Sequence, residues 1–484
     1  MDEHGMSSNT FGSTMAREAL VGNQFSGHTN ISFHGTLDES KKRKEEEKKE
    51  RKDRKKRQKH EDEKEACLRS LAFHEINARR HDIANAHPET CDWLFETPEF
   101  RQWMDPASLQ DHNGVFWIKG KPGAGKSTLM KHAYRYCQRT MSSNYYLIAY
   151  FFNARGEALE KTPLGMLRSI VYQLLQSDNA LYQHFRSDFT TPEGDRQWRQ
   201  SELQDFISWA ATQHLSKPFL LLVDALDECN EADVRQVVAF LESLSIYAYW
   251  AKTQLRICLS SRHYPSITIG KSVTLTVEES LCHGADISKY INRSLRGGNT
   301  SIQDEIQERA NGIFLWVVLV VSMLNKAYDE GQIEAMQATL EQVPDDLDKM
   351  FSAILTKEVT NPSETVSMFQ WVLLSIRRLT SEELFAAVME PGPSTLYTSE
   401  SIQRRITTSS KGLIELRWRA DPGALNAQFI HLSVRDFLFR YKTLQKLDAA
   451  LGPNPSTTIH GRLWARCWFS INNAVATSTF QEHM

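Results

Sequence analysis

The sequence has little that would place it in a membrane, outside the cell or on nucleic acid. Its most hydrophobic stretch, Gly312 to Met323, is far shorter than the ~20 apolar residues that a membrane span needs, so we expect a buried helix there. The chain begins Met1-Asp2-Glu3-His4, without the apolar core of a signal peptide. The formal net charge of −3 gives no global attraction to polyanions. We therefore expect a soluble protein of the cytoplasm with no membrane partner.

Cysteine is scarce and unpatterned. The seven cysteines include no C-x-x-C pair, which gives no basis for a zinc site or a disulfide framework. A reducing, intracellular compartment fits this usage best. With 484 residues, of which 41% are hydrophobic, the chain is long enough for roughly three or four domains with their own cores.

One motif says more about the function of the chain than these absences do. Residues 120–127 read Gly-Lys-Pro-Gly-Ala-Gly-Lys-Ser and fit G-x-x-x-x-G-K-[ST], the phosphate-binding P-loop. Glycines let backbone N–H groups approach phosphate oxygens without a Cβ in the way, and the helix that follows directs its positive end to the same place. Lys126 adds a charge for the β- and γ-phosphates, and Ser127 offers a hydroxyl to Mg²⁺. We predict nucleotide contacts from Gly120, Pro122, Gly123, Ala124, Gly125, Lys126, Ser127 and Thr128.

The setting of the motif supports this interpretation. The apolar run 115–118 precedes the loop and reads as a buried strand, and residues 128–133 read as a helix. Strand, glycine loop and helix in this order are what a P-loop requires. A glycine turn that merely joins a strand to a helix is the simpler alternative.

A second signal supplies the carboxylate that Mg²⁺ needs. Residues 219–223 are apolar and typical of a central strand, and Asp224 follows at its carboxyl end, where ligands bind in open α/β sheets. We predict that Asp224 and Ser127 hold the metal. Asp227 or Glu228 could orient or deprotonate the water that attacks the γ-phosphate. The alternative is that this acidic pair caps the next helix.

A third signal ends the next strand. Residues 255–262 read Leu-Arg-Ile-Cys-Leu-Ser-Ser-Arg. An arginine in the place of Arg262 could contact the γ-phosphate and report its presence. Taken alone this signal is weak, because arginines often end strands.

Together these segments resemble the NACHT domains of STAND-type signalling NTPases, and in particular fungal NLR-like incompatibility proteins, whose NTPase region is also called nephrocystin-3-like. The resemblance rests on residues 120–127, 220–228 and 260–262 and extends over roughly residues 66 to 440. Further similar segments are Thr90 to Leu94, Phe151 to Gly156 and Gly312 to Val317.

The resemblance implies a role for one histidine. In NACHT receptors a histidine at the end of the winged-helix domain reaches the β-phosphate of ADP and holds the closed state, and His431 matches that position. The simpler alternative is a histidine packed beside Phe429 and Phe437. Related receptors also carry a Gly-x-Pro segment near the base, but Gly312-Ile313-Phe314 has no proline. This departure leaves the choice between ATP and GTP open.

The N-terminal region is polar and then charged. Residues 1–40 cannot bury enough apolar surface to fold alone. The stretch from Asn9 to Phe33 has the sparse apolar character of the amyloid-like signalling motifs that such fungal proteins carry. The alternative is a disordered tail. Basic clusters from Lys41 to Arg57 suggest a nuclear alternative for the location. Acids interleaved at i,i+4 spacing favour a solvated helical spacer over residues 41–65, and the absence of interleaved aromatics argues against a nucleic-acid partner.

We therefore expect an α/β P-loop NTPase fold, with a parallel sheet covered by helices on both faces, followed by a helical domain and a winged-helix-like domain. Expected strands span 115–118, 147–152, 219–223, 256–260 and 273–277, and two strand-like runs, 413–416 and 427–430, would form the wing hairpin. Leu68, Leu71, Ile76 and Ile83 lie near one helical stripe. The expected division is a polar tail (1–40), a charged spacer (41–65), a helical linker (66–110), the NTPase (111–278), a helical domain (279–350), a winged-helix-like domain (351–445) and a C-terminal tail (446–484).

The expected function is a nucleotide-controlled switch. ADP would bridge the P-loop and the winged helix through Lys126 and His431, and exchange for ATP–Mg²⁺ would engage Ser127, Asp224 and Arg262 and open surfaces for self-association. Hydrolysis would be slow or absent, and the N-terminal region would bind a protein partner or effector. The alternatives are a scaffold whose nucleotide is structural and a work-performing P-loop ATPase.

Overall fold

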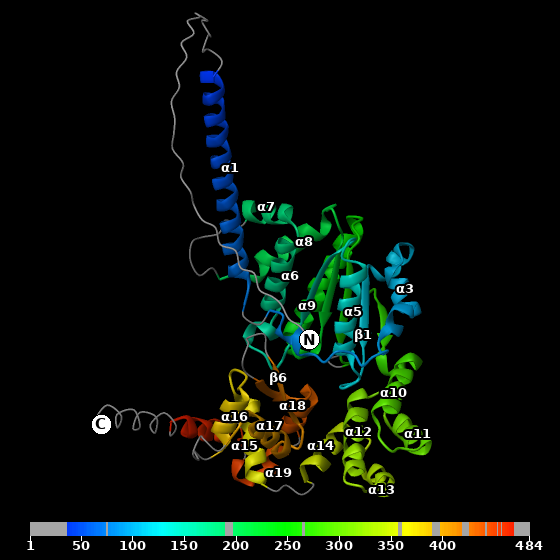
Figure 1. Ribbon diagram of the computed structural model, residues 1–484. Coiled ribbons are helices and arrows are strands. Elements are labelled where there is room, and N and C mark those ends of the chain that lie inside the picture. Colours follow the sequence, from blue (N-terminus) through cyan, green and yellow to red (C-terminus); the bar gives the residue numbers. More distant parts are fainter. Residues whose placement is uncertain are drawn as a thin grey trace, which may run out of the picture. The chain divides into compact units, whose positions relative to one another are not determined.

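Figure 1 shows a computed structural model of the chain. It describes residues 36–73, 76–188, 197–263, 267–356, 361–389, 397–418, 425–440, 443–452, 454–455 and 457–468. The chain divides into two compact units, Met1–Glu63 and Lys64–Met484. The interpretation of Asn9 to Phe33 lies outside the described residues. In the described parts of the chain, no helix combines the length and the apolarity that crossing a membrane requires.

The charged segment lies in one helix, α1 (Thr36–Leu71). Residues 36–40, which we expected in the disordered tail, form its first turn. Lys59 and Glu63 pair at i,i+4 spacing, with 3.9 Å between Nζ and Oε1, as the interleaved charges predict. The last turn changes character, because Cys67 and Leu71 are buried in a hydrophobic core.

The predicted stripe from Leu68 to Ile83 does not lie on one helix. After α1 ends at Leu71, the chain forms only short helical segments before the sheet. These segments are α2 (Ala78–Asp82), η1 (Asp92–Glu96), α3 (Pro98–Met104), η2 (Pro106–Ser108) and α4 (Leu109–His112). Leu68 and Leu71 therefore lie in α1, whereas Ile76 and Ile83 lie on either side of the short helix α2.

A five-stranded parallel sheet forms the centre of the NTPase region, and this confirms the expected α/β fold. The strands run in the order β2-β3-β4-β1-β5. Every expected strand is present, with ends shifted by at most one residue. They are β1 (Val115–Lys119), β2 (Tyr146–Phe151), β3 (Phe219–Asp224), β4 (Arg256–Ser261) and β5 (Val273–Thr276).

Helices cover both faces of the sheet, as the continuous apolar strands predict. On one face Phe116 and Leu222 pack with residues of α3 and α5 (Lys126–Thr140). On the other, Trp117 and Leu221 pack with α6 (Pro163–Ser177), α8 (Gln200–Thr212) and α9 (Glu231–Trp250), and Figure 1 shows these helices beside the sheet. The remaining short elements of this region are η3 (Ala158–Lys161), α7 (Asn179–Asp188), η4 (Leu226–Glu228) and η5 (Val277–Glu279).

The strand order positions the site. Strand β4 lies between β1 and β3, so the P-loop after β1, Asp224 at the end of β3 and Arg262 after β4 all meet at one edge of the sheet. Carboxyl ends of parallel strands form the usual ligand-binding edge of such a fold.

The rest of the chain is mainly helical. The hydrophobic stretch from Gly312 forms helix α12 (Phe314–Asp329), whose Trp316 and Val320 are fully buried, as expected. The two strand-like runs pair as an antiparallel hairpin, β6 (Ile414–Trp418) and β7 (Leu425–Phe429). The other elements are α10 (Leu281–Ser294), α11 (Thr300–Arg309), α13 (Ala335–Gln342), α14 (Leu347–Thr356), α15 (Pro362–Leu374), α16 (Ser381–Val388), α17 (Ser399–Ser409), α18 (Leu432–Phe439), α19 (Thr443–Leu447) and η8 (Ala449–Leu451).

Several of the expected domain boundaries fall inside helices of the structure. The division between residues 350 and 351 falls inside α14, where Phe351 lies 5.6 Å from Phe437 of α18 between ring centroids. The expected C-terminal tail begins with packed residues, because Leu451 and Ile459 are buried in the same core as α12 and α18. The boundaries expected after residues 40 and 65 both fall inside α1, and those expected after residues 110 and 278 fall inside α4 and η5.

Candidate nucleotide-binding site

The P-loop has the backbone conformation that its glycines permit. Gly123 and Gly125 have φ of +80° and +93°, in the region that favours glycine. A Cβ on Gly123 would lie 3.0 Å from the Cβ of Leu315. Helix α5 begins immediately after the loop without a side-chain cap, which leaves the N–H groups of its first turn available to an anion.

Lys126 lies folded over the loop. Its Nζ donates to the carbonyl oxygens of Gly120 at 2.8 Å and Lys121 at 2.9 Å. Burial lowers the pKa of Lys126, and the carboxylate of Asp227 opposes this effect. A phosphate group in the loop would add the anionic partner that this buried amine lacks.

Asp224 has the features of a metal ligand. It is fully buried, and its Oδ1 accepts a hydrogen bond from Ser260, whereas Oδ2 has no hydrogen-bond partner. Burial raises the pKa of Asp224 to about 6, an effect opposed by hydrogen bonds from Ser260 and Ser127. A buried carboxylate oxygen without a donor costs stability, and a divalent cation would satisfy it, so Asp224 with Ser127 fits Mg²⁺.

The donor set also fits this particular metal. Within the described ranges, no group of three or more His, Cys, Asp and Glu side chains is placed to hold a metal ion. Mg²⁺ is commonly held by one or two carboxylates, a hydroxyl, waters and substrate phosphates rather than by a complete protein cage.

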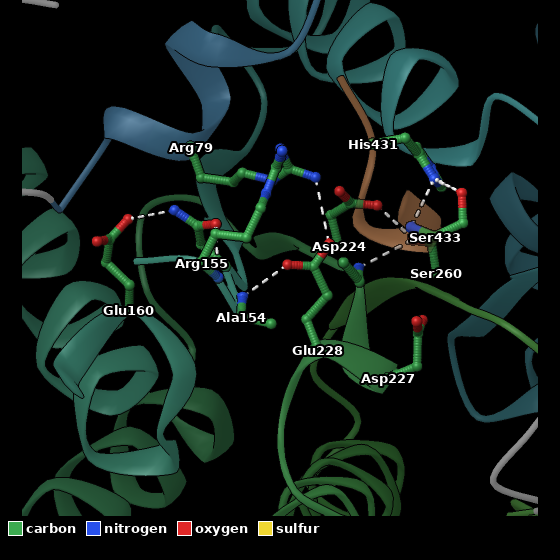
Figure 2. A network of polar contacts seen from close by, with 12 residues as sticks. Arg79, Ala154, Arg155, Glu160, Asp224, Asp227, Glu228, Ser260, His431 and Ser433 are labelled. Carbon is green, nitrogen blue, oxygen red and sulfur yellow. Dashed lines mark hydrogen bonds and ion pairs between the residues drawn. The ribbon is translucent and has the colours of Figure 1, made fainter. Parts of the chain in front are cut away.

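Asp227 and Glu228 are held by different partners. Asp227 contacts Arg262 twice, through Oδ2 to Nε at 2.8 Å and Oδ1 to the backbone N at 2.9 Å. Glu228 contacts Arg79 through Oε1 at 3.2 Å and accepts from the backbone N–H of Ala154 through Oε2 at 2.7 Å. Figure 2 shows the Glu228 carboxylate directed toward Ala154 and away from Asp227.

The capping alternative for this acidic pair is wrong. The N-cap of α9 is Asn230, whose side chain accepts from the backbone N–H of Asp233 at 2.9 Å. Asp227 and Glu228 precede this cap in the short helix η4 and make the long-range contacts described above, so a capping role does not account for them.

Arg262 connects the sheet edge to the C-terminal part of the chain. Its Nη1 lies 2.8 Å from Oδ2 of Asp436 in α18, while its Nε contacts Asp227. One guanidinium therefore bridges two carboxylates from segments far apart in the sequence. Any γ-phosphate that engaged Arg262 would compete with both carboxylates.

His431 lies on the wall of the same cavity. It is the N-cap of α18, and its Nδ1 lies 2.8 Å from Oγ of Ser433 and accepts from the Ser433 N–H at 3.1 Å. Burial lowers the pKa of His431 well below its usual range, and the charge of Arg262 adds to this. The imidazole is therefore neutral at pH 7, and Nε2 carries its proton because Nδ1 accepts.

A cavity of about 460 Å³ joins these groups, a volume within the range of small-molecule sites. It is lined by most of the predicted residues and also by α12 and the β6–β7 hairpin. Gly120 and Asp224 lie outside the lining, since Gly120 contributes a carbonyl to Lys126 and Asp224 lies buried behind Ser260. The predicted residues on the cavity wall are Pro122, Gly123, Ala124, Gly125, Lys126, Ser127, Thr128, Asp227, Glu228, Arg262 and His431.

Three charged residues of the site were missed by sequence reasoning. Arg79 reaches Glu228, Asp436 reaches Arg262, and Arg155 donates from Nη1 to the carbonyl oxygen of Phe429 at 2.6 Å. No local spacing marks Arg79 or Asp436. Arg155 lies in the segment Phe151 to Gly156, which belongs to the family resemblance.

Comparison with known proteins agrees with this geometry. Residues 89–262 match the family model described as Nephrocystin 3, N-terminal. This segment is therefore similar to the N-terminal domain of nephrocystin-3-like proteins. The chain is also 25% identical over 369 residues to the vegetative incompatibility protein HET-E-1 of Podospora anserina, in an alignment that covers 72% of this chain and 26% of that protein. The expected resemblance to fungal NACHT and nephrocystin-3-like proteins is confirmed, although the chain spans only about a quarter of that relative's length.

Solved structures match more loosely. Cdc6p from Pyrobaculum aerophilum is 9% identical, with a TM-score of 0.35 over 80% of this chain and 98% of that chain. The Walker-type ATPase PABY2304 of Pyrococcus abyssi is 15% identical, with a TM-score of 0.33 over 74% of this chain and 99% of that chain. At such scores the fold is better judged from the strand order than from either match.

Proposed function

We propose that this nucleotide-binding, NLR-like protein is a signalling switch controlled by exchange of ADP for ATP. The observation that carries the proposal is the composition of one cavity. Its wall combines the P-loop with His431 and other residues of the hairpin and α18. A nucleotide in this cavity would touch the NTPase and the C-terminal part of the chain at once, so its identity can alter how they pack.

In the proposed resting state ADP contacts Lys126 and the Nε2–H of His431. The β-phosphate then occupies the P-loop, where Lys126 Nζ currently donates to loop carbonyls. The contacts of Arg262 with Asp227 and Asp436 stay intact, because ADP has no γ-phosphate to compete for the guanidinium. ATP and ADP are the proposed ligands, and GTP remains open.

Exchange for ATP with Mg²⁺ would change these contacts. Mg²⁺ would neutralise phosphate charge, and Ser127 and Asp224 would hold it. Arg262 would turn toward the γ-phosphate and weaken its contact with Asp436. A shift from 1:99 to 99:1 needs about 5.5 kcal/mol of differential binding, and charge-assisted hydrogen bonds of this kind supply much of it. Opening would allow self-association, and the N-terminal region would bind a protein partner.

The setting of the switch is proposed from the relatives. HET-E-1 is described as a vegetative incompatibility protein, so we place this chain in an intracellular recognition response of that kind, in the cytoplasm. Hydrolysis by Asp227 or Glu228 would be slow and would reset the switch.

The test is the identity of the nucleotide released when the purified chain is heat-denatured. We expect stoichiometric ADP from the wild type and none from Lys126→Ala, because the loop loses its cation. An empty wild-type site that also fails to take up added ADP or ATP would contradict the switch and favour a scaffold.

A further inference from the structure

A short segment before the sheet, residues 79–91, contacts several parts of the chain around the cavity; we call it the strap. Its first residue, Arg79, pairs with Glu228 after β3. Lys131 of α5 donates from Nζ to the carbonyl oxygens of His81, at 3.3 Å, and Ile83. The strap is thus tied both to the acidic strand and to the P-loop helix.

The other end of the strap contacts the helical region after the NTPase. The ring of His87 lies 5.3 Å from that of Tyr290, edge to face. The backbone N–H of Cys91 donates to Oδ2 of Asp286 at 2.7 Å. Both partners belong to α10, so the strap runs from the acidic strand to a helix of the next region.

The middle of the strap contacts the C-terminal region. Asp82 and Arg378, which lies just before α16, form an ion pair in which both side chains are more than nine-tenths buried. A buried pair of opposite charges is costly to separate. The position of the strap is therefore linked to that of the C-terminal region.

From these contacts we infer that Arg79 is a positioning residue that restrains ATP hydrolysis by holding Glu228 away from the attacking water. The inference rests on the nucleotide switch proposed above. We call the restraint of hydrolysis by the contact between Arg79 and Glu228 the brake. Figure 2 shows the guanidinium of Arg79 directed at Glu228 and lying between the strap and the end of β3. The pair is largely shielded, with exposed side-chain fractions of 12% for Arg79 and 5% for Glu228.

Arg79 restrains hydrolysis because both oxygens of the Glu228 carboxylate already have partners. Hydrolysis forms a bond from the water oxygen to the γ-phosphorus and breaks the bond from that phosphorus to the β–γ bridging oxygen, whose electron pair leaves with ADP. Glu228 takes the proton of the water. A base must be within hydrogen-bond reach of that proton, but Oε1 of Glu228 contacts Arg79 and Oε2 accepts from the N–H of Ala154. Release of Arg79 frees Oε1 for the water.

The link to Arg378 gives the brake a release mechanism. When the C-terminal region moves on activation, the ion pair with Asp82 breaks and the strap loses its anchor. Arg79 then leaves Glu228, so hydrolysis becomes fast only after the switch has opened. The reset is in this way delayed until the signal has been given.

The experiment measures single-turnover hydrolysis of ATP bound with Mg²⁺ to the full chain. With the site saturated with ATP, Arg79→Gln is expected to raise the rate at least about tenfold, and Arg79→Lys, which keeps a cation near Glu228, is expected to restore the slow rate. Arg79→Gln combined with Glu228→Gln should return to the slow rate, because the freed base is gone.

Two further variants separate the brake from general loosening. Arg80→Ala is the matched control, since Arg80 lies over the ring of Tyr134 at 4.2 Å and does not contact Glu228; its rate should equal that of the wild type. The double variant Asp82→Asn with Arg378→Gln removes the ion pair that anchors the strap without leaving a lone buried charge. It should raise the hydrolysis rate. When it is combined with Arg79→Gln, the rate should be no higher than that of Arg79→Gln alone.

The outcomes distinguish the two proposals. A wild type that binds ATP, with an Arg79→Gln rate that is unchanged or reduced, would overturn the brake and leave the switch standing. A wild type that binds no nucleotide would overturn both. A rise that survives Glu228→Gln would show that Arg79 acts on something other than Glu228 and would also overturn the brake.

Discussion

At the scale of single residues, the cavity is built from charged groups whose burial is only partly compensated. Asp224 Oδ2, Arg79 Nε and Arg155 Nε are buried without hydrogen-bond partners. Each such atom costs stability relative to its hydrated state. Their grouping around one site suggests that a ligand, rather than the fold, compensates for them.

Asp224→Asn should therefore stabilise the ligand-free protein at pH 7 and abolish Mg²⁺-dependent nucleotide binding. Burial raises the folded pKa of Asp224 to about 6, so the folded state binds more protons than the unfolded state between about pH 4 and pH 6. Across that window the wild type loses stability relative to the variant as pH rises, by up to about 3 kcal/mol. Denaturant unfolding of both proteins at pH 4, 5, 6 and 7 measures this difference.

The control is Asp205→Asn, because Asp205 is exposed on α8. Its stability difference from the wild type should stay flat over the same pH range. A similar slope for Asp224→Asn and Asp205→Asn would mean that Asp224 is not the group responsible.

At the scale of elements, the structure extends the folded core beyond the point where a tail was expected. Residues 457–468 are helical, and Ile459 is 1% exposed in the core that also contains α12 and the hairpin. The same helix carries Trp464 and Trp468 on its exposed side. One face of this segment is therefore part of the packing, although its sequence is short and weakly patterned.

Ile459→Ala is expected to lower the free energy of unfolding by about 2–5 kcal/mol, the usual cost of such a truncation in a core. Trp464→Ala, on the same helix but 67% exposed, should change it by less than about 0.5 kcal/mol. Denaturant unfolding followed by circular dichroism compares the two variants. If both variants changed the free energy of unfolding by equally small amounts, the segment would not belong to the folded core.

At the scale of the whole molecule, a few long-range polar contacts join segments on opposite sides of the cavity. Arg262 contacts Asp436, Arg155 contacts the Phe429 carbonyl, and Arg435 of α18 donates from Nη1 to the Ala154 carbonyl at 3.1 Å. Two of these contacts are made by residues of the cavity wall, Arg262 and Arg155. A ligand that alters one of them can alter the packing of the hairpin and α18 on the NTPase.

Asp436→Asn should shorten the retention of bound ADP by several-fold, because Arg262 loses its charged partner in α18 and the closed packing weakens. Release of a fluorescent ADP analogue after dilution into unlabelled ADP measures the rate. The matched control is Asp348→Asn on α14, since Asp348 pairs with Arg440 at 3.9 Å and does not contact Arg262. Equal release rates for the wild type and Asp436→Asn would show that the contact does not hold the closed state.

Local patterns were sufficient for the elements and for much of the site. Phosphate and metal binding impose residue types at fixed spacing. A few consecutive residues are therefore enough to identify the P-loop, the apolar strand ending in Asp224 and the strand followed by Arg262. Strands β1, β2 and β3 follow from continuous apolar runs, since a parallel sheet covered on both faces favours apolar residues throughout its strands. The hairpin β6–β7 follows from two short strand-like runs in which apolar and polar residues alternate.

What the sequence by itself determined is therefore the parallel sheet and the chemistry at its carboxyl edge, because both depend on short-range order along the chain. Only the tertiary structure decided which charges meet: Arg79 with Glu228, and Arg262 with Asp436. An ion pair between residues separated by 149 or 174 positions imposes no spacing on the sequence, and arginine and aspartate also occur throughout solvated surfaces. The cavity, and the strap that contacts its acidic strand, exist only once those distant segments are packed together.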